Sequence, residues 1–363
     1  MSQINFSELF KTTHDEHHST PVNKSRFILS IGYYFFVMLI VASFVFLLFD
    51  QLGDSSVPSL KETITPQVEV ERLFDQYENL VVVLPNTMIL DFTMYTTFPF
   101  NDDYFMMVDD TFDAFIVVDG ANTLPPSYVI SSLSTGYLDV ATQASFIPEA
   151  LLGYEVIDTI LGTNYTAFTS LANSLINFVI YILLFPVLFF LLKPYIYKDF
   201  LDAKTYSSKW IGLIIAGYLY VLAGNIFANV LSQLVYLITG REQIESVNQT
   251  IIMDSLQGNG VFFMVFSAVI LGPIVEELIF RKAFFGIISN QKIAVVLSSL
   301  TFGLIHVLAE PTFTDLVINI IPYVVIGFVF GYIYTKQNKN LLIVTIVHML
   351  TNLISIISIL LIY

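Results

Sequence analysis

The sequence predicts an all-α polytopic membrane bundle of about seven transmembrane helices, with a small β-containing domain inserted between the first two spans. Of the 363 residues, 55% are hydrophobic and only 12% are charged, about half the charged fraction of a soluble domain. Several apolar runs exceed about 18 residues, which is long enough to cross a bilayer. One stretch, residues 50–170, breaks this pattern because it holds most of the acidic residues.

The N-terminal part predicts a tail and an anchor. Residues 1–26 are polar and lack helical periodicity, so we expect a cytoplasmic tail. Residues 27–49 form the first apolar run, and the absence of a small-residue cleavage site after it is typical of an uncleaved signal anchor. Lysine and arginine before this run place the N-terminus in the cytoplasm of a multi-pass cell-membrane protein, by the positive-inside rule.

Residues 50–170 predict an acidic extracytoplasmic domain. They contain 18 Asp and Glu against two basic residues, Lys61 and Arg72. The length is that of one small domain. Short β-rich runs alternate here with turn residues, which indicates strands. The runs are Leu80–Leu84, Ile89–Tyr95, Phe105–Val108 and Phe115–Val118.

The rest of the chain predicts six further spans. Residues 171–204 contain one transmembrane helix and a cytoplasmic linker, and residues 205–363 form the core of the bundle. The shortest of these spans is tilted or partly re-entrant in this interpretation. The spans are Leu171–Leu192, Trp210–Ile238, Val261–Ser289, Ile293–Leu308, Leu316–Tyr334 and Leu341–Ile362.

Two adjacent acids, Glu276 and Glu277, lie inside one of these spans. An ionised carboxylate at the centre of a membrane helix costs roughly 2.5–3.5 kcal/mol on insertion scales, so such residues indicate a functional site. Arg281 follows Glu277 at i+4 in the favoured orientation of a helical ion pair. We therefore expect Glu277 to be paired and Glu276 to act as a general base on water. Lys282 is expected to extend its amine to the cytoplasmic interface.

Both histidines outside the tail, His306 and His348, also lie in predicted spans. Glu276 and His306 are equally far from the turn around residue 291, roughly 20 Å along each helix, so an antiparallel hairpin brings them to one depth. Asn352 follows His348 at i+4 and shares its helix face. The sequence therefore predicts one site built from three helices.

Two mechanisms are open for this set of residues. Glu276, His306 and His348 form a plausible ligand set for a divalent metal, with zinc the first candidate and water as the fourth ligand. Alternatively, Glu276 and His306 activate water without a metal while His348 and Asn352 donate to a developing oxyanion. Hydrolysis of an amide suits either mechanism.

Three motifs carry a family resemblance. Glu276 to Arg281 reads E-E-x-x-x-R, Phe302 to His306 reads F-x-x-x-H, and His348 to Asn352 reads H-x-x-x-N. In this order and inside membrane helices they resemble the CAAX-protease and bacteriocin-processing (CPBP, or Abi) family of intramembrane endopeptidases. The resemblance covers roughly residues 205–363.

The resemblance implies an intramembrane metalloendopeptidase, or a glutamate-type enzyme without a catalytic metal. Glu276, Glu277, Arg281, His306, His348 and Asn352 would form its catalytic site. It also implies a membrane-associated peptide or protein substrate, in CAAX-type processing, peptide maturation or bacteriocin self-immunity. A non-catalytic membrane scaffold or immunity protein that regulates a sensor kinase or binds a bacteriocin is the alternative.

The residues outside the motifs narrow the possible partners. The chain has no cysteine, which excludes disulfides and a cysteine nucleophile, and no basic cluster outside the tail, so no nucleic-acid partner is expected. The first span, the acidic domain and the second span lie outside the resembling region. The acidic domain is a candidate contact for an envelope or signalling partner.

Overall fold

A computed structural model describes residues 23–64, 80–85, 96–99, 104–108, 116–119, 126–131, 155–161, 165–239 and 245–362. These residues fall into two compact units, divided after Leu60 and after Ala167. The predicted cytoplasmic tail therefore lies almost wholly outside the described residues, as does the predicted strand at 89–95.

The unit from Lys61 to Ala167 contains β-strands. A six-stranded sheet has the order β3-β4-β2-β6-β5, with β7 also paired to β6, and its strand pairs are antiparallel. A separate two-stranded sheet joins β1 to β8. The strands are β1 (Lys61–Ile64), β2 (Leu80–Pro85), β3 (Thr96–Pro99), β4 (Tyr104–Val108), β5 (Ile116–Asp119), β6 (Pro126–Ser131), β7 (Glu155–Leu161) and β8 (Tyr165–Phe168).

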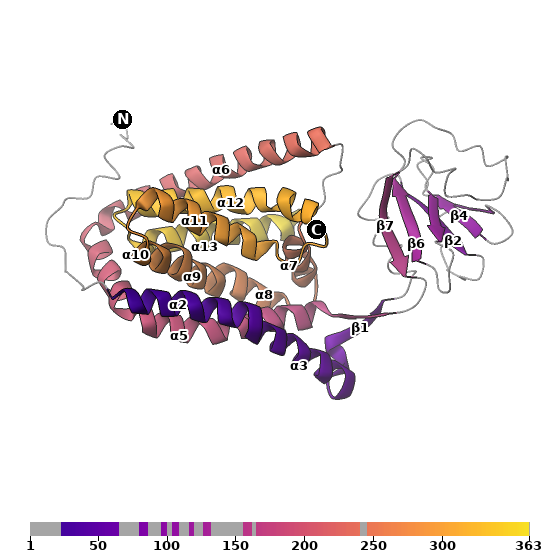
Figure 1. The fold of residues 1–363 in the computed structure, drawn as a ribbon, viewed down its shortest axis with the longest axis horizontal. Helices are drawn as coiled ribbons and strands as arrows, with labels where there is room; N and C mark the ends of the chain where they lie inside the picture. The colour runs from indigo at the N-terminus through magenta and orange to yellow at the C-terminus, as the bar shows by residue number, and fades with distance from the viewer. Residues whose placement is uncertain are drawn as a thin grey trace. The chain divides into compact units, whose positions relative to one another are not determined.

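The second unit is a helical bundle whose two N-terminal helical segments lie beside one long helix (Figure 1). The run α2 (Lys24–Phe36), a π-helical turn (Val37–Val41) and α3 (Ala42–Ser55) is continuous, so the helix extends beyond the predicted end of the first span at residue 49. It packs along α5 (Ser170–Thr205), which begins at the N-cap Thr169. The ring centroids of Phe27 and Tyr195 lie 4.6 Å apart.

The remaining helices complete the bundle. α6 (Trp210–Thr239) and α7 (Val247–Gln257) precede a continuous helical run of α8 (Val261–Phe266), η5 (Ser267–Leu271), α9 (Gly272–Glu276), η6 (Glu277–Ala283) and α10 (Phe284–Ile287), in which η5 and η6 are π-helical. α11 (Gln291–His306), α12 (Phe313–Lys336) and α13 (Leu341–Ile362) follow.

Six helical runs of the described chain are long and apolar enough to cross a membrane, so the count of seven is not confirmed. The difference is α11, which stands where the sequence predicted the span 293–308 and has 16 residues. At about 1.5 Å per residue it is roughly 24 Å long, shorter than the hydrocarbon core. The chain is nevertheless a membrane protein of several apolar helices.

Small residues let α11 and α12 approach closely, as membrane helices commonly do. A Cβ atom at Gly303 would lie 2.5 Å from Val324 Cγ2, and one at Gly327 would lie 3.0 Å from the Cα atom of Ser299. The hairpin of these two helices carries His306 at the end of α11. Close packing of the hairpin therefore fixes the position of that histidine.

Candidate active site

The helical run from Val261 to Ile287 presents two acids to the interior because its winding changes between them. Glu276 is the last residue of α9 and Glu277 is the first residue of the π-helical segment η6. The exposed fractions of the two residues are 7% and 0%. A π-helical turn alters the rotation between neighbouring residues and occurs often at functional sites. The two carboxylates consequently meet different partners.

Glu276 lies among three side chains from three other helices. Its carboxylate is 4.0 Å from His306 Nε2 and 3.6 Å from His348 Nε2. Tyr181 on α5 donates a hydrogen bond of 3.0 Å to Glu276 Oε1. Thus α9, α11 and α13 bring together three of the four residues that the sequence predicted to converge, and α5 adds Tyr181.

The hydrogen bonds of the two imidazoles assign their protons. His306 Nδ1 lies 2.7 Å from the carbonyl oxygen of Phe302, which can only accept, so Nδ1 carries hydrogen. His348 Nδ1 lies 3.0 Å from the Glu277 carboxylate and must also donate. In their neutral forms both rings therefore turn an Nε2 lone pair toward Glu276.

Three acceptors face one another as a result: two imidazole lone pairs and the Glu276 carboxylate. The separations of 3.6 and 4.0 Å exceed a direct hydrogen bond. A bridging water suits such a gap, because it donates two hydrogens to acceptors on either side. The arrangement can hold a water molecule against a carboxylate base.

Glu277 is enclosed with Arg281, and both residues are 0% exposed. Arg281 Nε lies 3.2 Å from Glu277 Oε2, so the i, i+4 ion pair is present as the sequence predicted. The guanidinium carbon also lies 5.5 Å from the ring centre of Phe302 and 5.7 Å from that of Phe330. These two rings offer cation–π contacts to Arg281, whose Nη1 and Nη2 have no hydrogen-bond partner among the described residues.

Asn352 holds the backbone near the site. Its Nδ2 donates a hydrogen bond of 2.8 Å to the carbonyl oxygen of Ala268 in η5. This hydrogen bond links α13 to the π-helical segment. Asn352 also lines the same cavity as Glu276.

The site opens into a cavity of about 500 Å³. Glu276, His306, His348 and Asn352 line it together with polar residues of α6, α7 and α12. Tyr323 of α12 stacks on His306 with ring centroids 4.7 Å apart. A polar cavity of this size within an apolar bundle can hold water and a segment of a peptide.

The predicted metal ligands Glu276, His306 and His348 have donor types that suit zinc. Among the described residues, no group of three or more His, Cys, Asp and Glu is placed to hold a metal ion. The Glu276 carboxylate lies 4.0 Å from His306 Nε2 and 3.6 Å from His348 Nε2, somewhat farther than the roughly 3.3–3.4 Å between two ligands of one tetrahedral zinc ion. The metal therefore stays a prediction, and no chemical step is derived through it.

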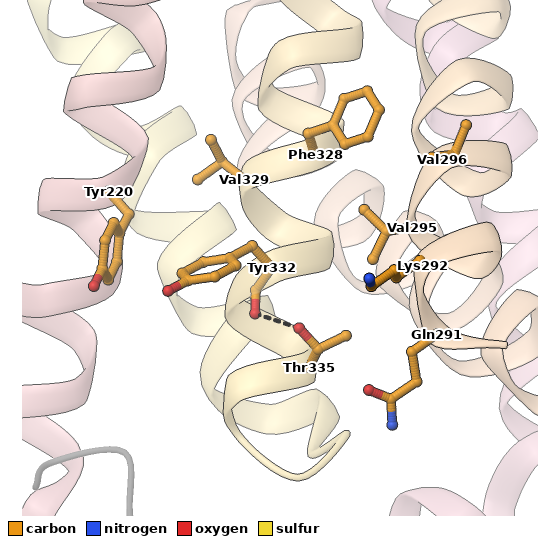
Figure 2. A pocket seen from close by; sticks show the side chains of 9 residues that line it. All are labelled: Tyr220, Gln291, Lys292, Val295, Val296, Phe328, Val329, Tyr332 and Thr335. Atoms are coloured by element: carbon orange, nitrogen blue, oxygen red, sulfur yellow. Dashed lines mark hydrogen bonds between the residues drawn. The ribbon is translucent and has the colours of Figure 1, made fainter. Parts of the chain in front are cut away.

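A second cavity, of about 550 Å³, lies between α6, α11 and α12 (Figure 2). Its lining is largely apolar, and Tyr332 lies between Tyr220 and the α11 side chains in that view. No acid or histidine is among its lining residues, and its ionisable side chains are one lysine and two tyrosines. The residues that line this second cavity are Tyr220, Gln291, Lys292, Val295, Val296, Phe328, Val329, Tyr332 and Thr335.

Lys282 has a partner that the sequence did not predict. Its amine lies 2.6 Å from the carboxylate of Asp199 on α5. The same carboxylate accepts the backbone N–H of Leu341 at the start of α13. Burying a lysine and an aspartate together is less costly than burying either one alone.

Sequence reasoning missed two site residues. Tyr181 lies far outside the three motifs, and its only sequence signal is a hydroxyl within an apolar span. Phe302 is the first residue of F-x-x-x-H, and its ring contacts Arg281 and, at 4.5 Å between centroids, His306. The fixed spacing of that motif was the signal that could have revealed it.

Comparisons with known proteins match the segment of the chain that holds the three motifs. Residues 258–354 match the family model described as type II CAAX prenyl endopeptidase Rce1-like. The protein named "Putative membrane peptidase YdiL" from Bacillus subtilis is 33% identical over 141 residues, which cover 38% of this chain and 51% of that protein. UPF0177 protein YxdF from Lactococcus lactis is 37% identical over 84 residues, covering 23% and 43%.

An uncharacterized protein of Mycoplasma capricolum is 30% identical over 121 residues, which cover 32% of this chain and 34% of that protein. The aligned regions thus span about a third to a half of the lengths of these relatives. No solved structure gave a significant match. The model match confirms the resemblance that the three motifs predicted: residues 258–354 of this membrane protein are similar to the Rce1-like CAAX prenyl endopeptidase family.

Proposed function

We propose that the chain is an intramembrane endopeptidase that hydrolyses a peptide bond in a membrane-associated protein or peptide. The observation that carries the proposal is the meeting of Glu276 with the Nε2 atoms of two histidines inside a polar cavity. The family match and the relative named as a membrane peptidase support the same class of activity.

The residues have distinct roles in this proposal. Glu276 takes a proton from a water held between its carboxylate and His306 Nε2, and the water oxygen attacks the carbonyl carbon of the scissile bond. The proton then passes to the departing amine nitrogen as the C–N bond breaks. Tyr181 orients the carboxylate through its hydrogen bond, and Glu277 orients His348 through Nδ1.

His348 and Asn352 are proposed to stabilise the tetrahedral oxyanion. Asn352 uses one amide hydrogen on Ala268 and keeps the other for the cavity. His348 donates to the oxyanion from Nε2 when its ring is doubly protonated, while its Nδ1 stays hydrogen-bonded to the Glu277 carboxylate. Zinc held by Glu276, His306 and His348 remains the competing proposal, and it requires these side chains to move together.

Purified protein in lipid nanodiscs, incubated with a membrane-anchored fluorogenic peptide, tests the proposal. Glu276→Gln and His306→Ala are expected to lower cleavage by roughly 10²- to 10⁴-fold, the contribution typical of a general base. Asp54→Asn, an exposed acid at the end of α3, serves as the control and should cleave normally. Cleavage that survives Glu276→Gln would contradict the role of Glu276. No cleavage by the unmodified protein, together with cellular function that Glu276→Gln retains, would favour the scaffold.

A chelator arm separates the two mechanisms. Activity that is lost with chelator and restored by zinc would support the metal ligands. Activity that is unchanged by chelator would support the glutamate-type mechanism. Neither outcome affects the assignment of Glu276, because both mechanisms need its carboxylate.

A further inference from the structure

One face of α6 carries a row of polar side chains into the site cavity. Asn225, Asn229, Ser232 and Tyr236 all line that cavity. Their spacing of four, three and four residues places them on one helix face. This helix lies outside residues 258–354, the segment that matches the family model.

Three of these side chains have no hydrogen-bond partner in the part of the chain that the structure describes. They are the half-buried Asn225, the exposed Asn229 and Ser232, whose hydroxyl is buried. Tyr236 differs, because its hydroxyl donates to Asn319 on α12 at 3.3 Å. A buried, unpaired hydroxyl in a membrane helix is costly and indicates a bound ligand or water, and the two carboxamides beside it are open to the same ligand.

The charge of the cavity restricts that ligand. Its lining contains Glu276 and Glu245 but no lysine or arginine. An anionic ligand such as a phosphate would therefore meet two acids, with no lysine or arginine to bind it. Carboxamides donate and accept at once, which matches a neutral group that also does both, namely the amide of a peptide main chain.

The spacing of the row also suits an extended peptide. Four residues along a helix rise roughly 6 Å. In an extended chain, amide groups that point the same way recur every two residues, roughly 6.6–6.8 Å. Adjacent carboxamides on α6 can thus meet successive amides on one edge of the same strand.

We propose that the polar row of α6, formed by Asn225, Asn229 and Ser232, binds the main chain of an extended substrate segment that leads to Glu276. The inference rests on the proposed endopeptidase function, since it assigns a substrate form to the same cavity. The row reads main-chain amides rather than side chains, so it selects unfolded segments with little regard to their sequence.

Binding to the Glu276→Gln protein in nanodiscs tests this inference separately from cleavage. The probe is a fluorescent, membrane-anchored peptide, and a second probe carries N-methyl groups on alternate main-chain nitrogens. Asn225→Leu and Asn229→Leu are each expected to raise the Kd of the first probe by roughly 2- to 12-fold, the effect of losing one hydrogen bond. Ile226→Ala, on the same helix but 59% exposed, is the matched control and should leave the Kd unchanged.

The second probe identifies the atoms involved. N-methylation should weaken binding to the Glu276→Gln background but cause a smaller further loss in the asparagine variants. An equal penalty in all variants, or an unchanged Kd after both asparagine substitutions, would overturn the inference. Thermal unfolding of each variant shows that it is folded, and Ser232→Ala gives a third, smaller perturbation of the same row.

The two proposals can fail separately. Specific, N-methyl-sensitive binding without cleavage by the unmodified chain would retain the binding row and reject the endopeptidase. Cleavage by the unmodified chain, together with a Kd that neither asparagine substitution changes, would retain the endopeptidase and reject the binding row. Absence of any peptide binding would reject the row.

Discussion

The buried pair of Glu277 and Arg281 gives the sharpest test of how the site is held. Replacing Arg281 by Met keeps much of the side-chain length but removes the cation. At the observed 3.2 Å and an effective dielectric constant of about 20, the attraction lost is about 5 kcal/mol. Removing one member of a buried pair usually costs about 3–5 kcal/mol, because the other charge stays buried and unpaired. We expect Arg281→Met to destabilise the bundle by that amount.

The double variant Glu277→Gln/Arg281→Met separates this charge effect from packing. It leaves no uncompensated charge, and the amide oxygen of Gln can still accept from His348 Nδ1. Neutral replacement of a buried ion pair is often close to neutral for stability. The double variant is therefore expected to recover most of the loss, which makes the two substitutions strongly non-additive.

Equilibrium unfolding in mixed micelles measures the free energy of unfolding for each variant. Lys193→Met, an exposed cation on α5, is the matched control and should show little change. The reasoning is refuted if Arg281→Met costs less than about 1 kcal/mol, or if the double variant loses the sum of the two single effects.

Three further perturbations test separate parts of the structure. Tyr181→Phe removes the hydroxyl that donates to Glu276 and should lower kcat for peptide cleavage by roughly 10-fold without changing the free energy of unfolding. A kcat equal to that of the unmodified protein would show that Tyr181 does not contribute to the site. Gly327→Ala crowds the backbone of α11 and should lower the free energy of unfolding by about 1–3 kcal/mol. Gly32→Ala, which has open space around it, is the control and should not lower this free energy. Equal stability of the two variants would contradict the close packing of α11 and α12. Asp199→Ala leaves the buried amine of Lys282 without its ion-pair partner and should destabilise the bundle by several kcal/mol. Chemical denaturation measures this loss, and an unchanged unfolding midpoint would show that the ion pair does not stabilise the bundle.

The family and the core residues of the site were predictable from sequence because ionisable residues are rare in membrane helices. Two acids, two histidines and an arginine stand out against an apolar background, and helical periodicity relates their depths. The i, i+4 rule alone predicted that Glu277 pairs with Arg281, and the structure places them 3.2 Å apart.

Only the tertiary structure decided which groups from other helices complete the site. Tyr181 reaches Glu276 because α5 packs beside the run of α9, a contact that no local spacing encodes. Lys282 contacts Asp199, an acid 83 residues away in the sequence, so no local spacing could have predicted this pair. The length of α11 and the orientation of the α6 polar row likewise depend on packing.

The sequence by itself determined that this protein is a membrane bundle with an acidic and histidine-containing centre, because the cost of burying charge in lipid makes such residues conspicuous. The tertiary structure decided which atoms face each ring nitrogen of the two histidines, the hydrogen bond of Tyr181 to Glu276 and the polar wall of the cavity. These features arise from contacts between helices distant in sequence, and hydrophobic patterning constrains only which face of each helix is buried.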